Sequence, residues 1–349
     1  MTTRRAAENP IITPRDVMPS QEGLEVIGAF NAAATRLDDE IVLLVRVAER
    51  PINHDPSVTL AAVFDPTKGK IATIAFSRDD PANDMSDSRL VVSQGKTYLT
   101  SISHLRLARS QDGIHFKIDE RPTIAPTDPH ETFGLEDPRI TRIGDLYYIH
   151  YVAVSPLGVV TALASTCDFN SFERHGIIFA PENKDVALFP RKVDGLHYAL
   201  HRPYSPLFGR NDMWIASSPD LISWGNHRHL IGTRPGCWDE NRIGAGAPPV
   251  RIDEGWLEIY HGADHNNRYC LGALLLDAQQ PWKVLARSDT PIFAPEADYE
   301  CAGFFGNVVF TCGLLCEDNR LKLYYGAADS TTCYAEIPLP DVLSTLNSY

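Results

Sequence analysis

The stretch "ARSQDGIHF" at residues 108–116 has similar stretches further along the chain, and their spacing points to the fold. "ASTCDFNSF" (164–172) and "ASSPDLISW" (216–224) also place Ala and Ser before an Asp, with an aromatic residue four positions after it. A more divergent copy is "LDAQQPWKV" (276–284). The aromatic residues Phe116, Phe172, Trp224 and Trp282 lie 56, 52 and 58 residues apart. A spacing this regular indicates a repeated structural unit.

Each unit is composed of strand-like segments. The runs "LYYIHYVAV", "LHYALHRP", "WLEIYHGA" and "LKLYYGAA" each follow a short polar turn, and helical periodicity is almost absent. Four strands per unit of roughly 50 to 60 residues predict an all-β, five-bladed β-propeller, the first blade preceding residue 100. We expect one domain over 1–349, with a short helix within 340–349. A β-sandwich array is the alternative, but it does not explain so long a period.

Composition narrows the class of ligand. The 349 residues are 44 % hydrophobic and 22 % charged, with a formal net charge of −13. Such a balance disfavours binding to nucleic acid or to an anionic membrane and favours a neutral small molecule. Seven scattered cysteines without a C-x-x-C pair predict neither disulfides nor a zinc site, and we expect no metal and no cofactor. Without an export signal or an apolar span, a cytoplasmic location is expected, and the oligomeric state stays open.

Polar residues recur in apolar or glycine-rich surroundings, one set in each unit. Since a buried charge is costly unless it is paired or used, these residues are expected to meet around the central channel. They are Asn31, Arg46, Glu49, His104, Glu136, Asp137, Arg139, Lys184, Asp185, His201, Arg202, Asp239, Arg242, Glu258, Tyr260, His261, Glu300 and Asp329. Structural roles are the alternative: Arg46 and His104 could cross-link blades, Arg139 could neutralise Asp137, and Lys184–Asp185 could be a surface pair.

The segment "TFGLEDPRI" (132–140) concentrates charge most strongly. Glu136, Asp137 and Arg139 lie between Gly134 and Ile140, and Pro138 excludes a helix interior. A set rich in Asp, Glu, Arg, His and Tyr without a metal motif favours carbohydrate chemistry, because carboxylates supply acid and base. From the residues alone, we predict a sugar-binding or sugar-cleaving propeller.

Six ordered motifs resemble glycoside hydrolase family 130, the mannoside phosphorylases and related β-mannosidases. They are "GLEDPRI", "KDVALFP", "LHRP", "RIGAGAPP", "WLEIYHG" and "NVVFTCG…LYYGAAD", and the resemblance covers nearly the whole chain. It implies a five-bladed propeller in which Asp137 is the general acid, passing its proton through a hydroxyl of the mannosyl ring. A one-step inverting displacement then needs a nucleophile on the other face of the sugar.

The same resemblance leaves the nucleophile open. Phosphorylases of the family usually carry an arginine where this chain has Val159 or Val160, and an apolar residue where it has Glu258. We therefore expect an inverting hydrolase of β-1,2-linked manno-oligosaccharides, with Glu258 or Glu300 as the base. The alternative is a phosphorylase that uses inorganic phosphate as co-substrate and releases mannose 1-phosphate. A non-catalytic sugar-binding propeller is the second alternative.

Two further groups of residues complete the prediction. Residues that would bind the substrate are Asn31, Arg46, His104, Glu136, Arg139, His201, Arg202, Asp239, Tyr260, His261 and Asp329. Residues that could bind phosphate are Arg174, Lys184 and Arg242, because a dianion needs charge-assisted partners.

Overall fold

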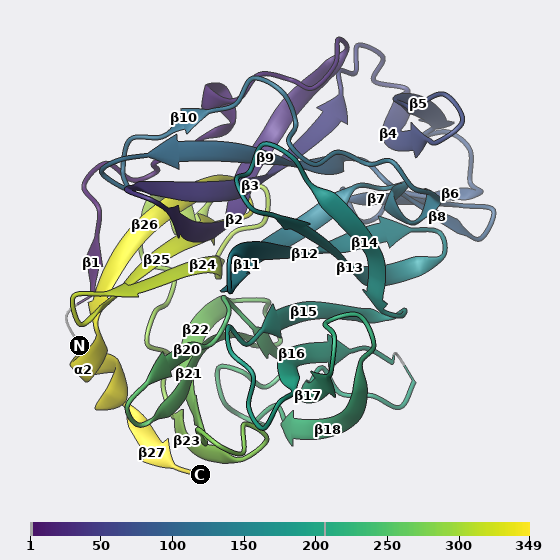
Figure 1. Ribbon diagram of the computed structural model, residues 1–349. Helices are drawn as coiled ribbons and strands as arrows, with labels where there is room; N and C mark the ends of the chain where they lie inside the picture. Colours follow the sequence, from purple (N-terminus) through teal and green to yellow (C-terminus); the bar gives the residue numbers. More distant parts are fainter. Residues whose placement is uncertain (1–2, 206) are drawn as a thin grey trace.

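The computed structural model describes residues 3–205 and 207–349. Five larger antiparallel sheets are arranged around a common centre (Figure 1). The first contains β2 (Leu24–Leu37), β3 (Glu40–Pro51), β9 (Ile102–Ser110) and β10 (Lys117–Ile118); the second contains β11 (Leu135–Ile143), β12 (Leu146–Ser155), β13 (Gly158–Thr166) and β14 (Glu173–Phe179). The third contains β15 (Asn183–Leu188), β16 (His197–Pro203), β17 (Met213–Ser218) and β18 (Gly225–Ile231).

The fourth sheet is the largest and the fifth is closed by the N-terminus. The fourth contains β19 (Arg242–Ala245), β20 (Val250–Ile252), β21 (Gly255–Ala263), β22 (Tyr269–Leu276), β23 (Val284–Ser288) and β27 (Leu346–Ser348). The fifth contains β24 (Val309–Glu317), β25 (Arg320–Ala327), β26 (Thr331–Pro338) and β1 (Arg4–Arg5). The all-β prediction is confirmed, and the arrangement is compatible with five propeller blades.

Helices are few and short among the described residues. Two 3₁₀ turns cover Pro14–Asp16 and Pro129–Glu131. The α-helices are α1 (Asp298–Cys301) and α2 (Leu339–Leu343), after which β27 joins the edge of the fourth sheet. None of the described helices is long and apolar enough to cross a membrane.

The sequence repeat corresponds to one recurring turn. The four copies span the connections β9–β10, β13–β14, β17–β18 and β22–β23, which join the two outer strands of the first four sheets. In each, the Asp of the motif accepts hydrogen bonds from backbone N–H groups two and three residues ahead, the typical Asx-turn. The fifth sheet has no such turn, because β1 pairs with β26 and supplies its outer strand.

Apolar side chains fill the space between neighbouring sheets. Leu44 and Leu105 of the first sheet pack in one cluster with Ile149 of the second. Phe189 and Trp256 join the third sheet to the fourth, with ring centroids 5.1 Å apart. Burial of this kind between sheets is the main stabilising term of the fold and holds the inner strands rigidly in place.

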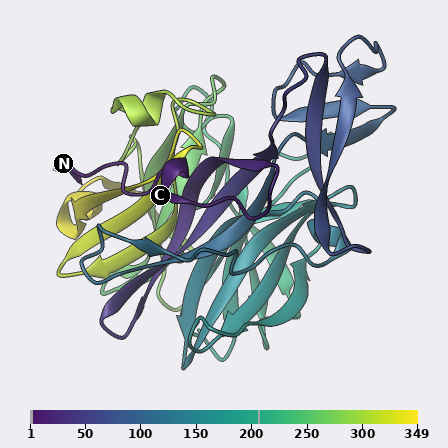
Figure 2. The same ribbon diagram turned by 90° about the horizontal axis from the view of Figure 1, so that it is seen from above.

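A separate small unit interrupts the first sheet. Between β3 and β9 the chain forms β4 (Val58–Asp65), β5 (Lys70–Ser77), β6 (Asn83–Asp84), β7 (Leu90–Ser93) and β8 (Lys96–Leu99). We call residues 52–100 the insertion; it projects from one side of the larger sheets (Figure 2). The N-terminal unit expected before residue 100 is therefore a four-stranded sheet with an inserted unit, completed by β9 and β10 after it.

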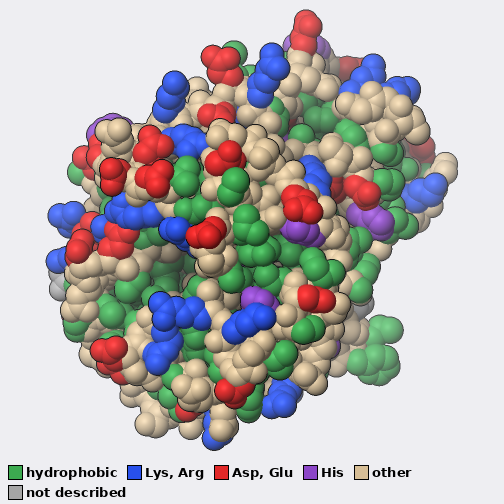
Figure 3. All heavy atoms as spheres, viewed as in Figure 1, with side chains coloured by type: hydrophobic (Ala, Val, Ile, Leu, Met, Phe, Trp, Pro, Cys, Tyr) green, Lys and Arg blue, Asp and Glu red, His purple; other side chains and the backbone are tan. Residues whose placement is uncertain are grey.

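The molecular surface mixes charges of both signs. On the face seen in Figure 3, Asp, Glu, Lys and Arg side chains are interspersed among hydrophobic and histidine side chains. No extended patch of one sign covers that face.

Candidate active site

The inner strands of three sheets carry the same backbone irregularity. Asn31 in β2, Asp137 in β11 and Asp185 in β15 each lie at a register shift, and their φ angles are +49°, +45° and +52°. Asn and Asp tolerate this left-handed conformation better than other non-glycine residues. Since a β-bulge re-aims a side chain, all three polar groups turn into one cavity instead of alternating along the strand.

This cavity has a volume of about 490 Å³ and lies where the sheets converge. Ten residues expected from the sequence to converge line it: Asn31, Arg46, Glu136, Asp137, Lys184, Asp185, Arg202, Arg242, His261 and Asp329. They come from all five sheets or the turns that follow them. Such a concave, polar pocket is the most probable site for a small ligand.

One side of the pocket holds three carboxyl groups around one guanidinium. We call it the Asp137 wall, and it comprises Asn31, Arg46, Glu136, Asp137 and Asp329. Arg46 donates from Nη1 to Asp137 Oδ1 at 2.9 Å and from Nη2 to Glu136 Oε1 at 2.7 Å. Asn31 donates a second bond to Asp137 Oδ1 at 2.9 Å. Arg46 also lies over the Phe30 ring, 4.8 Å from its centroid, which fixes the guanidinium.

The carboxyl groups of this wall have pKa values that diverge. Burial raises the pKa of Asp137, but the Arg46 charge and the Asn31 hydrogen bond outweigh burial, so the net shift is downward. Burial raises the pKa of Asp329 to about 6; Arg46 opposes the shift, while Asp137 and Glu136 reinforce it. Because Asp137 and Asp329 influence each other electrostatically, their titrations are linked, and the pair takes up a proton as the pH falls through about 6, the pKa of Asp329. Carboxyl pairs driven apart in this way are typical of acid catalysis.

The opposite side of the pocket, which we call the basic wall, is contributed by the third and fourth sheets. It comprises Lys184, Arg202, Arg242, His261 and Tyr269. Arg242 donates from Nη1 to the Tyr269 hydroxyl at 3.0 Å, and no carboxylate is paired with it or with Lys184 among the described residues.

The one carboxylate of the basic wall is already neutralised. Asp185 Oδ2 lies 2.6 Å from Arg202 Nη2 and 3.4 Å from His261 Nε2, and Arg139 Nη2 lies 3.8 Å from Oδ1. Burial raises the pKa of Asp185, yet these cations hold it well below the usual range. Asp185 therefore orients Arg202 and His261 and remains ionised.

The two glutamates expected as catalytic bases lie elsewhere. Glu258 is completely buried, accepts a bond from the Gly246 N–H at 2.8 Å, and leaves Oε2 without a partner; burial raises its pKa well above the usual value. Glu300, in α1, is also buried and accepts from Arg5 Nε at 2.8 Å and from the Tyr325 hydroxyl at 2.7 Å. Glu258 is thus a core residue outside the pocket, and Glu300 links Arg5 of β1 to Tyr325 of β25.

The structure places other predicted residues outside the pocket. Arg139 is buried and donates to the backbone carbonyls of Ala245 and Gly246, which joins the second sheet to the fourth. His104 lies between Glu49 and Arg106, with Nδ1 3.6 Å from the Glu49 carboxylate. The position of His104 fits its structural alternative, whereas the alternative for Arg139 was neutralisation of Asp137, to which its charge also contributes.

Asp239 and Tyr260 belong to a second structural cluster. Asp239 is fully buried and accepts from Arg287 at 2.7 Å, Arg234 at 2.8 Å and the Tyr260 hydroxyl at 2.9 Å. The strong polar groups of this cluster are paired with one another, so the cluster stabilises the fourth sheet. Asp239 and Tyr260 do not line the pocket.

His201 and Arg174 also lie away from the site. His201 is hydrogen-bonded to Asn183 and to His227, 3.1 Å away, beside another cavity on the third sheet. Arg174, on the outer strand β14, pairs with Glu131 at 2.7 Å. It is too peripheral to join the basic wall, although its charge made it a candidate.

Several lining residues were not among those predicted. Tyr269 and Asn267 complete the basic wall, and Arg89, carried by the insertion, enters the pocket from the rim and lies over the Phe305 ring. Nothing local marks Arg89, because only the fold brings the insertion to the pocket. No cluster of His, Cys, Asp and Glu suited to a metal ion occurs among residues 3–205 and 207–349.

Comparison with known proteins agrees with the geometry. Residues 82–348 match the model of a family described as beta-1,4-mannooligosaccharide phosphorylase. A beta-1,2-mannobiose phosphorylase of Listeria innocua serovar 6a is 49 % identical over 99 % of both chains. A 1,2-beta-oligomannan phosphorylase of Thermoanaerobacter sp. is 39 % identical over 69 % of this chain and 80 % of its own.

A solved structure shows the same fold. The Listeria innocua beta-1,2-mannobiose phosphorylase in complex with beta-1,2-mannobiose superposes with a TM-score of 0.96, over 99 % of each chain at 49 % identity. These relatives support the phosphorylase alternative better than the expected hydrolase. Val159 and Val160 do not line the pocket, whose positive charge comes mainly from the third and fourth sheets.

Proposed function

Since the chain belongs to glycoside hydrolase family 130, we propose that it is an inverting phosphorylase of β-1,2-linked mannosides. It would convert a β-1,2-mannoside and inorganic phosphate into α-mannose 1-phosphate and a shortened acceptor. Phosphate is a co-substrate, and the reaction uses no cofactor. We further infer that the five sheets are the blades of a closed propeller, with the pocket at the mouth of its channel.

The distribution of charge across the pocket carries this proposal. Hydrolysis needs a free carboxylate opposite the proton donor to activate water. The only carboxylate on the basic wall is Asp185, which is fully engaged by Arg202 and His261, and both predicted bases lie outside the pocket. Lys184 and Arg242 face the pocket without a carboxylate partner and suit a phosphate dianion.

The two walls match the two halves of an inverting displacement. The mannosyl unit would lie between them, with its hydroxyls bonded to Asn31, Arg46 and Asp329. A phosphate oxygen held by the basic wall attacks C1 from one face, and the C1–O bond to the leaving sugar breaks on the other. The Asp137 carboxyl supplies the proton that the leaving oxygen acquires, through a hydroxyl of the mannosyl ring. Opposed placement of charge and acid provides the electrostatic stabilisation that such a transition state needs.

Product analysis tests the proposal directly. The protein is incubated with β-1,2-mannobiose, with and without inorganic phosphate, and mannose and mannose 1-phosphate are followed by ¹H and ³¹P NMR. We expect cleavage only with phosphate and an initial product of α configuration. β-1,4-Mannobiose under the same conditions separates the two linkages that relatives use.

Two other results would select other functions. Mannose release that is independent of phosphate would establish the hydrolase. Tight mannoside binding without any turnover would establish the sugar-binding propeller. Asp137→Asn provides the control, because it should abolish turnover while mannobiose still binds.

A further inference from the structure

Two glycines lie directly behind polar groups of the catalytic pocket. Gly326 of β25 packs against Asn31, and Gly244 of β19 packs against Asp185 and His261. Both glycines are buried, and neither lines the pocket. Neither has a left-handed φ angle, so the backbone conformation does not call for glycine at these positions. Glycine is required instead by the space in front of each Cα atom.

At Gly326 the missing side chain leaves room for the Asn31 amide. A Cβ atom at this position would overlap Asn31 Oδ1 and lie 2.9 Å from the Asn31 backbone nitrogen. Asn31 is buried, its Oδ1 has no hydrogen-bond partner, and its Nδ2 donates to Asp137 Oδ1 at 2.9 Å. A methyl group on residue 326 would therefore turn the amide away and break its bond to Asp137.

At Gly244 the missing side chain leaves room for an ion pair. A Cβ atom there would overlap Asp185 Oδ2 and lie 2.6 Å from His261 Cε1. Asp185 Oδ2 is the oxygen that accepts from Arg202 Nε at 2.7 Å and lies 3.4 Å from His261 Nε2. A methyl group on residue 244 would therefore separate Asp185 from two residues of the basic wall.

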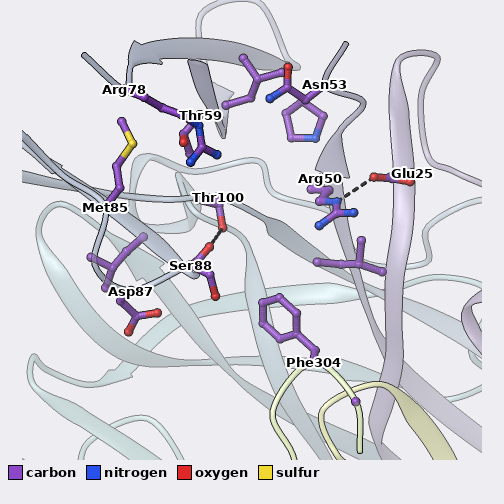
Figure 4. A pocket seen from close by; sticks show the side chains of 15 residues that line it. Glu25, Arg50, Asn53, Thr59, Arg78, Met85, Asp87, Ser88, Thr100 and Phe304 are labelled. Carbon is purple, nitrogen blue, oxygen red and sulfur yellow. Dashed lines mark hydrogen bonds and ion pairs between the residues drawn. The ribbon is translucent and has the colours of Figure 1, made fainter. Parts of the chain in front are cut away.

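Enclosure distinguishes these contacts from others on the same strands. At the outer end of β2 and β3, Arg50 donates from Nε to Glu25 Oε1 at 2.7 Å (Figure 4). These two side chains are 52 % and 45 % exposed, so a displaced group finds another arrangement in solvent at little cost. Asn31 and Asp185 are buried among close-packed neighbours and have no such freedom.

We propose that Gly326 and Gly244 are positioning residues of the reaction, one behind each wall of the pocket. Gly326 keeps Asn31 on the general acid Asp137, and Gly244 keeps the Asp185 carboxylate on Arg202 and His261. This inference rests on the proposed function, which assigns proton transfer to the Asp137 wall and phosphate binding to the basic wall. The two glycines therefore act on different kinetic constants.

Kinetics of the two alanine variants test the inference. Gly326→Ala should lower kcat/KM for β-1,2-mannobiose at saturating phosphate about 10- to 100-fold, the worth of a hydrogen bond to a charged group, and leave KM for phosphate within about twofold. Gly244→Ala should raise KM for phosphate about 10- to 100-fold and leave kcat/KM for mannobiose at saturating phosphate within about threefold. Calorimetric titration with inorganic phosphate should show the same loss of affinity in Gly244→Ala and none in Gly326→Ala.

A double variant identifies the contact through which Gly326 acts. Asn31→Gly removes the amide, and glycine tolerates the φ of +49° at this position. Adding Gly326→Ala to this variant should change kcat/KM by less than about twofold, because the group that the methyl displaces is already absent. If Gly326→Ala alone does not fold, the double variant should fold. Multiplicative effects, or a double variant that also fails to fold, would overturn the inference.

Gly272→Ala is the matched control. Gly272, in β22, is also buried and has no left-handed φ angle. A Cβ atom there would lie 2.7 Å from Tyr260 Cε1 and 2.8 Å from Trp238 Cη2, and both rings lie outside the pocket. The control should lower thermal stability as the test variants do, with the constants for mannobiose and phosphate within about twofold of wild type.

The inference is overturned if either test variant changes the constants for mannobiose and phosphate equally, or if both variants behave like the control. Failure of the proposed function is seen separately, as wild-type protein that yields no mannose 1-phosphate from mannobiose and phosphate. In that case the calorimetric comparison of Gly244→Ala with Gly272→Ala still decides, because equal affinities for phosphate would overturn the inference.

Discussion

Replacing Arg46 by Met should move the pH dependence of the enzyme in a direction that the structure specifies. Arg46 contacts Asp137 at 2.9 Å and Glu136 at 2.7 Å, and its charge lowers the pKa of both Asp137 and Asp329. In wild type the Asp137–Asp329 pair holds one proton below about pH 6, the pKa of Asp329. Because the leaving sugar needs that proton, kcat/KM should fall as the pH rises through this value.

The size of the shift follows from the geometry. Loss of an opposite charge within about 4–6 Å raises a carboxyl pKa by about 1–3 units, or roughly 1.4–4 kcal/mol. The alkaline limb of kcat/KM should therefore move from near pH 6 to about pH 7–9. Arg46→Lys keeps the charge and should shift it less.

The assay is phosphorolysis of β-1,2-mannobiose at saturating phosphate, followed as mannose 1-phosphate between pH 4 and 9. Arg36→Met is the control, since Arg36 also makes a two-pronged pair, with Glu317, but outside the pocket. Its pH profile should match that of wild type. A limb that does not move in Arg46→Met would refute the assignment of the proton to this pair.

Three further predictions concern Glu258 and Asp239, which lie outside the site, and Lys184, which lines it. Glu258→Gln should remain active, whereas replacement of a catalytic base would abolish activity. Because burial raises the pKa of Glu258, the contribution of this carboxyl to stability is lost as the pH rises above about 4.3. The variant should therefore gain thermal stability over wild type from pH 5 to 8, and a pH-independent difference would contradict this. Asp239→Asn, which leaves the buried Arg287 and the partly exposed Arg234 short of their carboxylate, should lower the free energy of unfolding in urea by about 3–5 kcal/mol, with KM for mannobiose nearly unchanged. Lys184→Met should raise KM for phosphate by about 10- to 100-fold and leave that for mannobiose within twofold, and equal effects on both would remove Lys184 from the phosphate site.

The sequence determined the features that depend on neighbouring residues. The Asp-to-aromatic motif predicts the turn between outer strands because the carboxylate bonds to backbone N–H groups two and three positions ahead, an interaction complete within five residues. The spacing of these turns gave the repeated unit, and the strand-like runs between them gave the all-β class. The segment around Asp137 was likewise recognisable, because charges flanked by glycine and proline identify an irregular strand.

The tertiary structure decided which charged residues belong to the site. Glu258 and Lys184 have equally promising contexts in the sequence, yet one is enclosed beneath Gly246 and the other faces the pocket. Local pattern does not reveal this difference, because the direction of a side chain on an inner strand depends on a bulge and on which sheet packs against it. The proposal of phosphate as nucleophile rests on the same kind of information, the ion pairs that Asp185 makes across strands far apart in the chain. Ion pairing acts through space over a few ångströms, whereas sequence records only order along the chain.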